Sequence, residues 1–256
     1  MIKFFRKIRY DLMNQNKTTK YFKYAIGEII LVVIGILIAL QINNWNENRK
    51  THINQEKYLV LLKKEAINNL NAIKISKKNT HNTFEGQRKL IELIDSDHDT
   101  ISEQYFSQVY SEVFFFTNQF KYENNVLSEL KTTGELKNIS NDNIRNNLMG
   151  FEALVEIIKS QEQSVEEIYK KSADFNRRYG SLRLVFDDLN LNDSLNFPKA
   201  RKQTSNIPLL KLKEFENNLY GYSGSVFNLL KWQYPQLEEH LNKLISLIDD
   251  ELDKDK

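Results

Sequence analysis

The side chains most able to do chemistry do not form a recognised catalytic or metal-binding pattern. The four histidines of the 256-residue chain form no HExxH motif and no close pair, and the chain has no cysteine. Zincin-type sites, cysteine-based zinc sites, thiol catalysis and disulfides are therefore excluded. We expect each histidine to be a polar surface residue, and we predict neither a metal nor a cofactor. The histidines are His52, His81, His98 and His240.

An acidic run matches part of a calcium-binding loop. Asp95, Asp97 and Asp99 occupy the first three ligand positions of such a loop. The loop also needs glycine at its sixth position and glutamate at its twelfth, where this chain has Thr100 and Phe106. The run is therefore interpreted as a solvated turn that ends a helix.

The segment 221–225, Gly-Tyr-Ser-Gly-Ser, resembles the GxSxG nucleophile elbow, but its last glycine is displaced and no strand precedes it. Two glycines in a long helix are more typical of a kink or a close crossing, and Pro235 is a second candidate for a bend. The sequence also has no Gly-rich phosphate loop or dinucleotide fingerprint. We predict that the protein is not an enzyme and has no catalytic residues.

One pattern of residues does suggest a site, and it lies within an apolar stretch. A carboxylate inside a membrane span is costly, and small residues let two helices approach closely. Glu28 and Gly35 are seven residues apart, and Ala39 follows four residues later on the same side of a helix. We predict that these three line a helix–helix contact in the membrane, with a second copy or a partner protein. The alternative is that Glu28 snorkels toward Lys20 or Lys23.

The apolar stretch has the length of a membrane span. A helix over residues 24–45 rises about 31 Å at ~1.5 Å per residue, close to the hydrocarbon thickness of a bilayer. We predict an uncleaved transmembrane signal anchor over residues 21–45, with Tyr24 and Trp45 as interfacial anchors. A buried helix of a soluble protein and a cleavable signal peptide are the alternatives. The latter would need small residues at a cleavage site, which the chain lacks after Leu40.

Charge predicts the orientation of this span. Of 36 basic and 34 acidic residues, seven and two lie in residues 1–45, so the remainder carries 29 and 32. The positive-inside rule then makes residues 1–20 a basic cytoplasmic leader, whose apolar spacing favours an interfacial helix over an unstructured leader. Residues 46–256 lie outside, in the periplasm if the membrane is a Gram-negative inner membrane. The net charge of −3 on this part argues against a nucleic-acid partner.

The rest of the chain has the composition and periodicity of a helical protein. Glycine (8) and proline (3) are scarce, and apolar residues recur by threes and fours. We predict an all-α fold in which one N-terminal transmembrane helix continues into an antiparallel bundle of long helices over residues 46–256. A loop is expected at about 189–208, and the segment 181–186 comes nearest to a strand. The expected helix boundaries are Thr100 as an N-cap, Lys121 as a start, Gly134 as a C-cap and Ser140 as an N-cap.

An aromatic cluster falls at a junction between the short helices. Phe114, Phe115 and Phe116 are consecutive, with Phe120 and Tyr122 close behind. They could form a docking surface, because aromatic residues dominate interface hot spots. Capping of the bundle core is the alternative, and it is the one we favour.

The sequence also resembles a known family. The leader 4–9, Phe-Phe-Arg-Lys-Ile-Arg, and the stretch 24–47 from Tyr-Ala-Ile-Gly-Glu to Asn-Trp-Asn-Glu resemble the opening of a domain-of-unknown-function family of Bacteroidota membrane proteins. The later stretch 130–136, Leu-Lys-Thr-Thr-Gly-Glu-Leu, is similar to the Leu-Lys-x-x-Gly stretch of that family. The resemblance implies a single-pass inner-membrane protein and supplies no activity.

These observations favour a membrane protein that acts by binding or scaffolding. Its expected partners are the lipid bilayer and either a partner protein or a second copy, reached through the transmembrane helix. A sensor that depends on a partner protein, an envelope-assembly subunit and a membrane-tethered enzyme are the alternatives. The last of these has no catalytic constellation to support it.

Overall fold

The structure is a computed structural model that describes residues 6, 10, 18–117, 119–202 and 204–254, without the side chains of 18–21 and 24. All regular elements in these ranges are helical, which confirms the all-α prediction. The chain divides into two compact units, Met1–Lys57 and Tyr58–Lys256. Most of the predicted leader helix in residues 1–20 lies outside the described residues.

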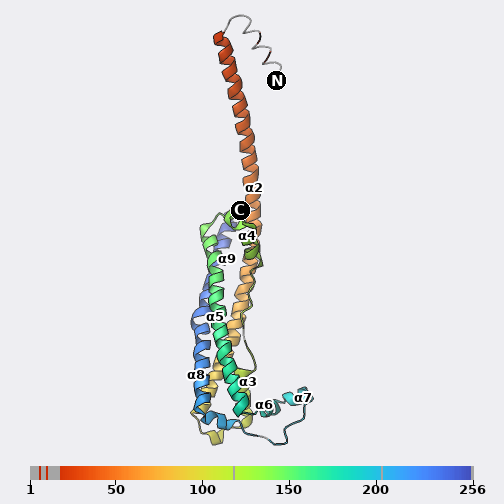
Figure 1. Ribbon diagram of the computed structural model, residues 1–256, viewed down its shortest axis with the longest axis vertical. Helices are drawn as coiled ribbons and strands as arrows, with labels where there is room; N and C mark the ends of the chain where they lie inside the picture. Colours follow the sequence, from red (N-terminus) through yellow and green to blue (C-terminus); the bar gives the residue numbers. More distant parts are fainter. Residues whose placement is uncertain (1–5, 7–9, 11–17, 118, 203, 255–256) are drawn as a thin grey trace. The chain divides into compact units, whose positions relative to one another are not determined.

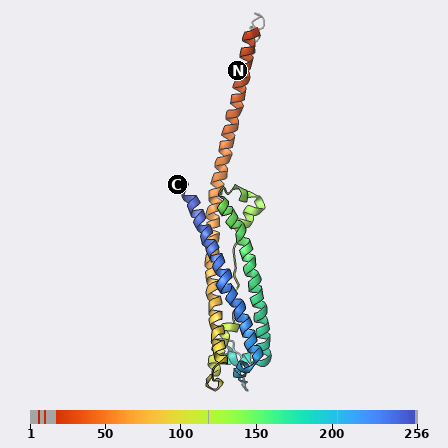
Figure 2. The same cartoon turned by 90° about the vertical axis from the view of Figure 1, so that its left-hand side faces the viewer.

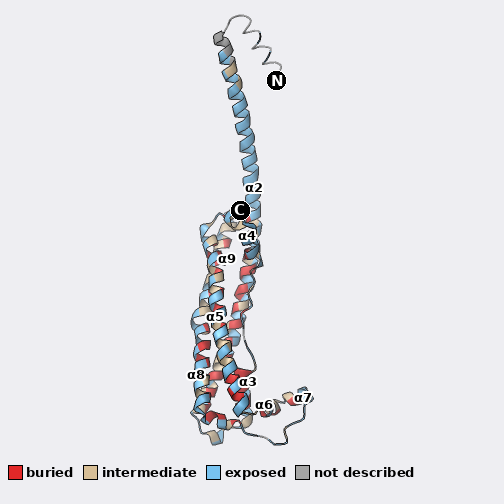
Figure 3. Ribbon diagram, viewed as in Figure 1, coloured by how far each residue is buried: buried red, intermediate tan, exposed pale blue. Residues whose placement is uncertain are grey.

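The first long element, α2, spans Thr18–Ile94 and has 77 residues (Figure 1). No glycine or proline occurs between Trp45 and Gly86, so nothing in the sequence interrupts the helix there. In the first unit, its residues from 29 to 54 are exposed, and this part is pale blue in Figure 3. From Tyr58 onward, one face of α2 is buried in the bundle.

The second unit adds seven further α-helices in the described residues. They are α3 (Glu103–Phe114), α4 (Asn125–Thr133), α5 (Asp142–Tyr179), α6 (Leu182–Asp188), α7 (Leu191–Ser194), α8 (Lys213–Asn228) and α9 (Tyr234–Asp253). Three short 3-10 segments lie between them: η1 (His98–Thr100), η2 (Glu135–Asn138) and η3 (Ile207–Lys211). A π-helical segment, η4 (Leu229–Gln233), joins α8 to α9.

Three long helical runs form the body of this unit: α2 from Tyr58, α5, and α8 continued by η4 and α9. The run through α9 is antiparallel to α2, because Lys63 pairs with Asp249 and Lys77 with Glu238. Figures 1 and 2 show these runs side by side.

The same run is also antiparallel to α5, because Asn141 bonds to Glu251 near one end and Glu162 to Tyr234 further along. Consequently α2 and α5 run in the same direction, a detail that the expected antiparallel bundle does not contain. The chain can do this because α3 and the segment after it return to the end of the bundle where α4 lies (Figure 1).

Two apolar clusters fill the bundle. One joins α2, α4, α5 and α9, and its fully buried members include Leu62, Ile73, Leu130, Ile144 and Tyr234. The other joins α2, α3, α5 and α8, and includes Leu90, Phe106, Val113, Phe175 and Phe215. Burial of this many large side chains is the main term that stabilises such a bundle.

Two of the predicted N-caps are wrong by one or two residues. The cap of α3 is Ser102, whose side chain accepts a backbone N–H three residues on, because Thr100 closes the turn η1. The cap of α5 is Asn141 in place of Ser140, because the side-chain oxygen of Asn141 accepts two backbone N–H groups of the first turn. The C-cap prediction at Gly134 is confirmed, with a left-handed φ of 73°.

Two local predictions need correction, and the segment that came nearest to a strand pattern is helical. The helix expected from Lys121 begins only at Asn125, because the preceding residues are extended and bonded to side chains of other helices. The segment 181–186, nearest to a strand by pattern, is the start of α6, which Ser181 caps. The loop expected at about 189–208 contains α7 and the first residues of η3.

The last helix carries its irregular segment next to Pro235. The π-helical turn η4 bonds the Tyr234 N–H to the carbonyl of Leu229, five residues earlier. Proline has no N–H to continue the regular ladder, and a wider turn is one way to absorb the break. Gly221 and Gly224, the other expected bend, lie within unbroken α8.

Candidate functional site

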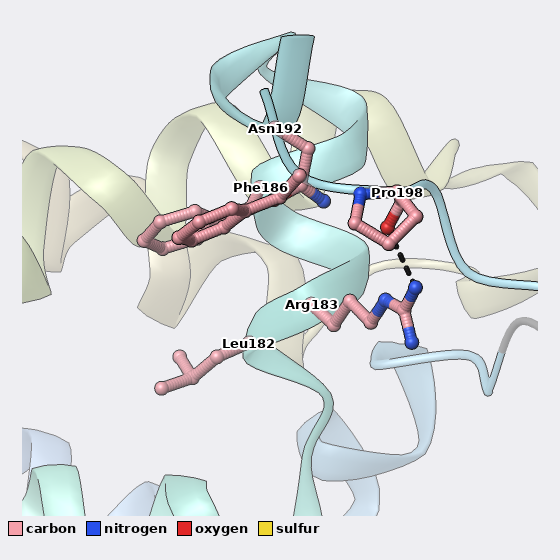
Figure 4. Close-up of a pocket in the computed structure, with 6 residues that line it drawn as sticks. Leu182, Arg183, Phe186, Asn192 and Pro198 are labelled. Atoms are coloured by element: carbon pink, nitrogen blue, oxygen red, sulfur yellow. Dashed lines mark hydrogen bonds between the residues drawn. The ribbon is translucent and has the colours of Figure 1, made fainter. Parts of the chain in front are cut away.

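An apolar pocket lies beside the bundle, where α6 and α7 meet the segment that follows them (Figure 4). Its volume is about 400 Å³. We call residues 189–202 the side loop. The pocket is formed by α6 and the side loop. The residues that line it are Leu182, Arg183, Phe186, Asn192, Phe197 and Pro198.

Two charged residues of α6 hold the side loop in place. Asp187 accepts hydrogen bonds from Asn192 Nδ2 at 2.6 Å and from the Ala200 backbone N–H at 3.0 Å. These donors, the backbone N–H first, lower the pKa of the Asp187 carboxyl. Arg183 donates to the Pro198 carbonyl at 2.6 Å and to the next carbonyl at 2.9 Å. The side chains of Asp187 and Arg183 therefore stabilise the conformation of the side loop.

No sequence motif marks this pocket. Its backbone turns at Asn190 and Asn196, which adopt positive φ values of 56° and 57°. Asparagine tolerates this conformation better than most residues, so an Asn-rich loop was the available signal. Phe197 is 59% exposed, which leaves an open apolar surface. The arrangement can bind an apolar group and has no nucleophile or acid–base pair.

A non-helical segment lies within the bundle, between α3 and α4. We call residues 119–124 the strap. Asn69, which is 2% exposed, accepts the Glu123 N–H at 2.7 Å and donates to the Glu123 carbonyl at 2.8 Å. Just beyond the strap, the buried carboxylate of Glu65 accepts the Val126 N–H at 2.9 Å. Polar residues are buried on α2 at these positions because they satisfy backbone groups that no helix pairs.

Glu162 on α5 holds the strap from the opposite side. A single oxygen, Oε1, accepts the Phe120 N–H and the Tyr234 hydroxyl, each at 2.8 Å. Burial raises the pKa of Glu162, although both donors act in the other direction. Burial, and secondarily the neighbouring carboxylate, raises the pKa of Tyr234. This arrangement fixes three elements together.

A polar groove of about 470 Å³ lies over Glu162. Its walls are charged and amide side chains from α5 and the strap, and several of these residues pair with one another, as Lys170 does with Glu166 at 2.6 Å. Because its only buried carboxylate is engaged in structure, the groove is a weaker candidate for a binding site than the apolar pocket. The lining residues are Gln119, Phe120, Lys159, Glu162, Gln163, Glu166, Glu167 and Lys170.

The residues predicted for a contact in the membrane lie in the first unit. Gly35 has nothing within 4 Å of the position that a Cβ would take, and Ala39 is exposed. Glu28 is half-buried. Trp45 is 63% exposed, with Arg49 over its ring at 5.9 Å. The side chain of Tyr24 lies outside the described residues.

The three consecutive phenylalanines have different surroundings. Phe114 belongs to the second apolar cluster, with its ring centroid 4.7 Å from that of Tyr110. Phe115 is half-buried and packs on Phe186 at 5.5 Å. Only Phe116, at 67% exposed, presents most of its ring to solvent. A docking surface at this junction would therefore depend on Phe116.

The histidines and acids are spread over the bundle. His240 bonds through Nε2 to the Asn147 carbonyl at 2.8 Å, and burial lowers its pKa. His98 bonds in the same way to the Ile94 carbonyl at 3.1 Å. Within the described ranges, no three His, Asp or Glu side chains are grouped as metal ligands.

The fold defines a class of protein: a helical bundle preceded by an apolar helix of membrane length. In the described residues, α2 is the one helix long and apolar enough to cross a bilayer. Residues 28–133, which run from within α2 to the end of α4, match the model of the family of unknown function DUF6090. The match confirms the resemblance to a domain of unknown function. Comparisons with curated proteins and with solved structures found no match.

Proposed function

We propose that this is a single-pass membrane protein whose helical bundle acts by binding or scaffolding, without catalysis. The observation that carries the proposal is the apolar surface of α2 in the first unit. Its large apolar side chains are 47–64% exposed, from Ile26 at 55% to Trp45 at 63%. A contiguous apolar surface of this size is unstable in water and is typical of a segment covered by lipid.

The charge distribution supports an orientation with the N-terminus in the cytoplasm. Residues 1–45 carry seven basic groups against two acidic ones, and the bundle side carries a small net negative charge. By the positive-inside rule the bundle then lies on the outer side of an inner membrane, in the periplasm. Tyr24 and Trp45 would mark the two interfaces.

Reporter fusions test this topology. Alkaline phosphatase fused after Lys256 should be active, and a cytoplasmic fluorescent protein at the same point should be dark. Fused after Lys20, the two reporters should behave in the opposite way. A control in which Asn43 and Asn44 are replaced by arginine, and the leader lysines by glutamine, should shift the pattern toward the reverse. Phosphatase activity after Lys20 in the native sequence would overturn the topology.

Within the membrane, we propose that Glu28, Gly35 and Ala39 face another helix, of a second copy or of a partner. The spacing of these residues, seven and four apart on one side of the helix, is what supports this. Gly35→Ile should block close approach and abolish a membrane two-hybrid signal, whereas Gly27→Ile is the matched control on a different face. An unchanged signal in Gly35→Ile would leave Glu28 as a boundary charge only.

The apolar pocket supports a second candidate, a sensor that signals through a partner protein. A pocket of about 400 Å³ can hold a small apolar ligand. A thermal-stabilisation screen of small apolar compounds, on the native chain and on Phe197→Ser, separates this role from scaffolding. A compound that stabilises only the native chain supports a sensor, and the absence of any such compound supports scaffolding.

A further inference from the structure

The part of α2 inside the second unit has two faces with different composition. The face toward the bundle carries Leu59, Leu62, Ala66 and Ile73, which are 3% exposed or less. The opposite face repeats at steps of three and four over residues 60–78, about 27 Å of helix at ~1.5 Å per residue. Its positions are Val60, Lys64, Ile67, Asn71, Lys74 and Lys78, all of them exposed. We call this second row the exposed seam.

Apolar residues are unusually exposed along this seam. Val60 is 56% exposed and Ile67 38%, and the flanking Leu61 and Ile75 are 47% and 62% exposed. Single exposed apolar residues need no explanation, but four of them along one face of one helix form a surface that fits a partner.

The charge of the seam has a single sign. Across residues 58–84 the only acidic residue is Glu65, and it is buried. In the described part of the chain, Lys64, Lys74 and Lys78 have no carboxylate within 4.0 Å, whereas Lys63 and Lys77, on the bundle side, pair with acids of α9. The charged residues of the exposed seam are therefore all lysines, while the Glu123 carboxylate beside it is bonded to Asn68 at 2.9 Å.

We infer that the exposed seam binds an acidic amphipathic α-helix of a partner protein. The apolar residues would pack against the apolar stripe of that helix, and the lysines would pair with its carboxylates. The inference rests on the proposed binding role and names its partner by chemistry. It does not depend on which side of the membrane the bundle lies.

Two other occupants fit the seam less well. A second copy in the same register would place lysine against lysine at several positions, which like-charge repulsion disfavours. A lipid surface suits a helix with a wide apolar face and basic residues at its margins. Here Lys64 and Lys78 lie at the centre of a narrow row.

The probe is a synthetic helix of three heptads with leucine at its core positions and glutamate beside them, labelled with fluorescein. Its basic counterpart has lysine in place of every glutamate. Each is titrated against the full chain in zwitterionic detergent micelles, and fluorescence anisotropy measures binding. We expect the acidic peptide to bind at least tenfold more tightly than the basic one, and more weakly at 300 mM than at 50 mM salt.

Charge reversal gives the sharpest form of the test. The chain with Lys64→Glu, Lys74→Glu and Lys78→Glu should prefer the basic peptide. A control with Lys137→Glu, Lys171→Glu and Lys213→Glu changes exposed lysines elsewhere and should keep the original preference. Ile67→Ser should weaken both peptides several-fold, and Ile157→Ser, at a 51% exposed residue of α5, should not. Circular dichroism confirms that every variant is folded.

Three results would overturn the inference. Equal binding of the two peptides, or an unchanged preference after charge reversal, would mean that the lysines do not select the partner. Dimerisation that Ile67→Ser abolishes, measured by sedimentation velocity, would assign the seam to a second copy. Lysine-dependent binding to phosphatidylglycerol vesicles without peptide binding would assign it to lipid. Reporter fusions read the topology alone, so failure of that proposal is distinguishable from failure of this one.

Discussion

The strap and the side loop both lie outside the long helices of the bundle, yet they are held in different ways. The strap is fixed by buried groups from two long helices, Asn69 on α2 and Glu162 on α5. The side loop is fixed mainly by α6, the helix that precedes it, through Asp187 and Arg183. A phenylalanine in each segment shows the contrast, because Phe120 is 5% exposed and Phe197 is 59% exposed.

The difference separates a segment required for the fold from one available for binding. The strap joins helices distant in sequence, so releasing it should disturb the whole bundle. The side loop makes mostly local bonds, so it can open or change without unfolding the unit. Segments of that second kind are where binding residues are most often found.

The largest expected effect on stability is the difference between substitutions of the two phenylalanines. Phe120→Ala should lower the free energy of unfolding by about 3–5 kcal/mol, because it removes a large buried ring and leaves a cavity. Phe197→Ala should change it by less than about 0.5 kcal/mol, because the ring is mostly in solvent. Denaturant unfolding of the full chain in micelles, followed by circular dichroism at 222 nm, measures both. Equal losses in the two variants would refute the contrast.

A smaller effect is expected at Glu162, and it should depend on pH. Burial raises the pKa of this carboxyl in the folded state. A raised acid pKa means that its contribution to stability is full below the unfolded pKa and is lost as pH rises through the folded pKa. Glu162→Gln keeps an oxygen that can accept both hydrogen bonds and carries no charge. At pH 8 this variant should therefore be more stable than the native chain.

The advantage of Glu162→Gln should fade as pH is lowered through the folded pKa of Glu162, because the native carboxyl then becomes protonated. Exposed Glu167 gives the control, and Glu167→Gln should show no such trend. The quantity to follow is the difference in unfolding free energy between variant and native chain, because other carboxyls titrate in both. A variant less stable than the native chain at pH 8 would show that the charge of Glu162 is needed to hold the strap.

The sequence predicted the helices better than either of these segments. Apolar spacing and scarce glycine indicated the long helices, and Gly134 marked a helix end, because these are local properties. The strap could not be predicted, since Lys121 fits a helix pattern and is extended only because side chains more than 40 residues away bond its neighbours. The reversal of direction that makes α2 and α5 parallel follows from the same long-range contacts.

The candidate sites also differ in how far the sequence predicts them. The apolar stretch and the row of Glu28, Gly35 and Ala39 are readable from spacing, because one helix carries them all. The apolar pocket is not, because it needs a helix, α6, where the pattern came nearest to a strand, and a loop that turns at Asn190 and Asn196. A lone aspartate, Asp187, gives no sequence signal that it accepts the backbone N–H of a residue 13 positions later.

The smallest global effect is expected at this aspartate. Asp187→Ala removes the acceptor for the Ala200 N–H and for Asn192, so the side loop should open locally while the bundle stays folded. Trypsin should then cut in residues 199–202, after the lysines and arginine found there, roughly tenfold faster. Asp193→Ala is the control, because that exposed carboxylate only pairs with Lys199 and should leave the cutting rate nearly unchanged.

Two further measurements test whether the side loop opens independently of the bundle. The pKa of Asp187 is lowered in the folded state, so its contribution is present above the unfolded pKa and is lost as pH falls through the folded value. Hydrogen exchange at the Ala200 amide, corrected for its intrinsic rate, should therefore differ between native chain and Asp187→Ala at neutral pH and converge in acid. The unfolding free energy should fall far less than in Phe120→Ala, because the bonds that Asp187 makes are local to the loop. A loss as large as that of Phe120→Ala would make the side loop part of the cooperative core, and binding at the pocket would then have to be coupled to the stability of the whole bundle.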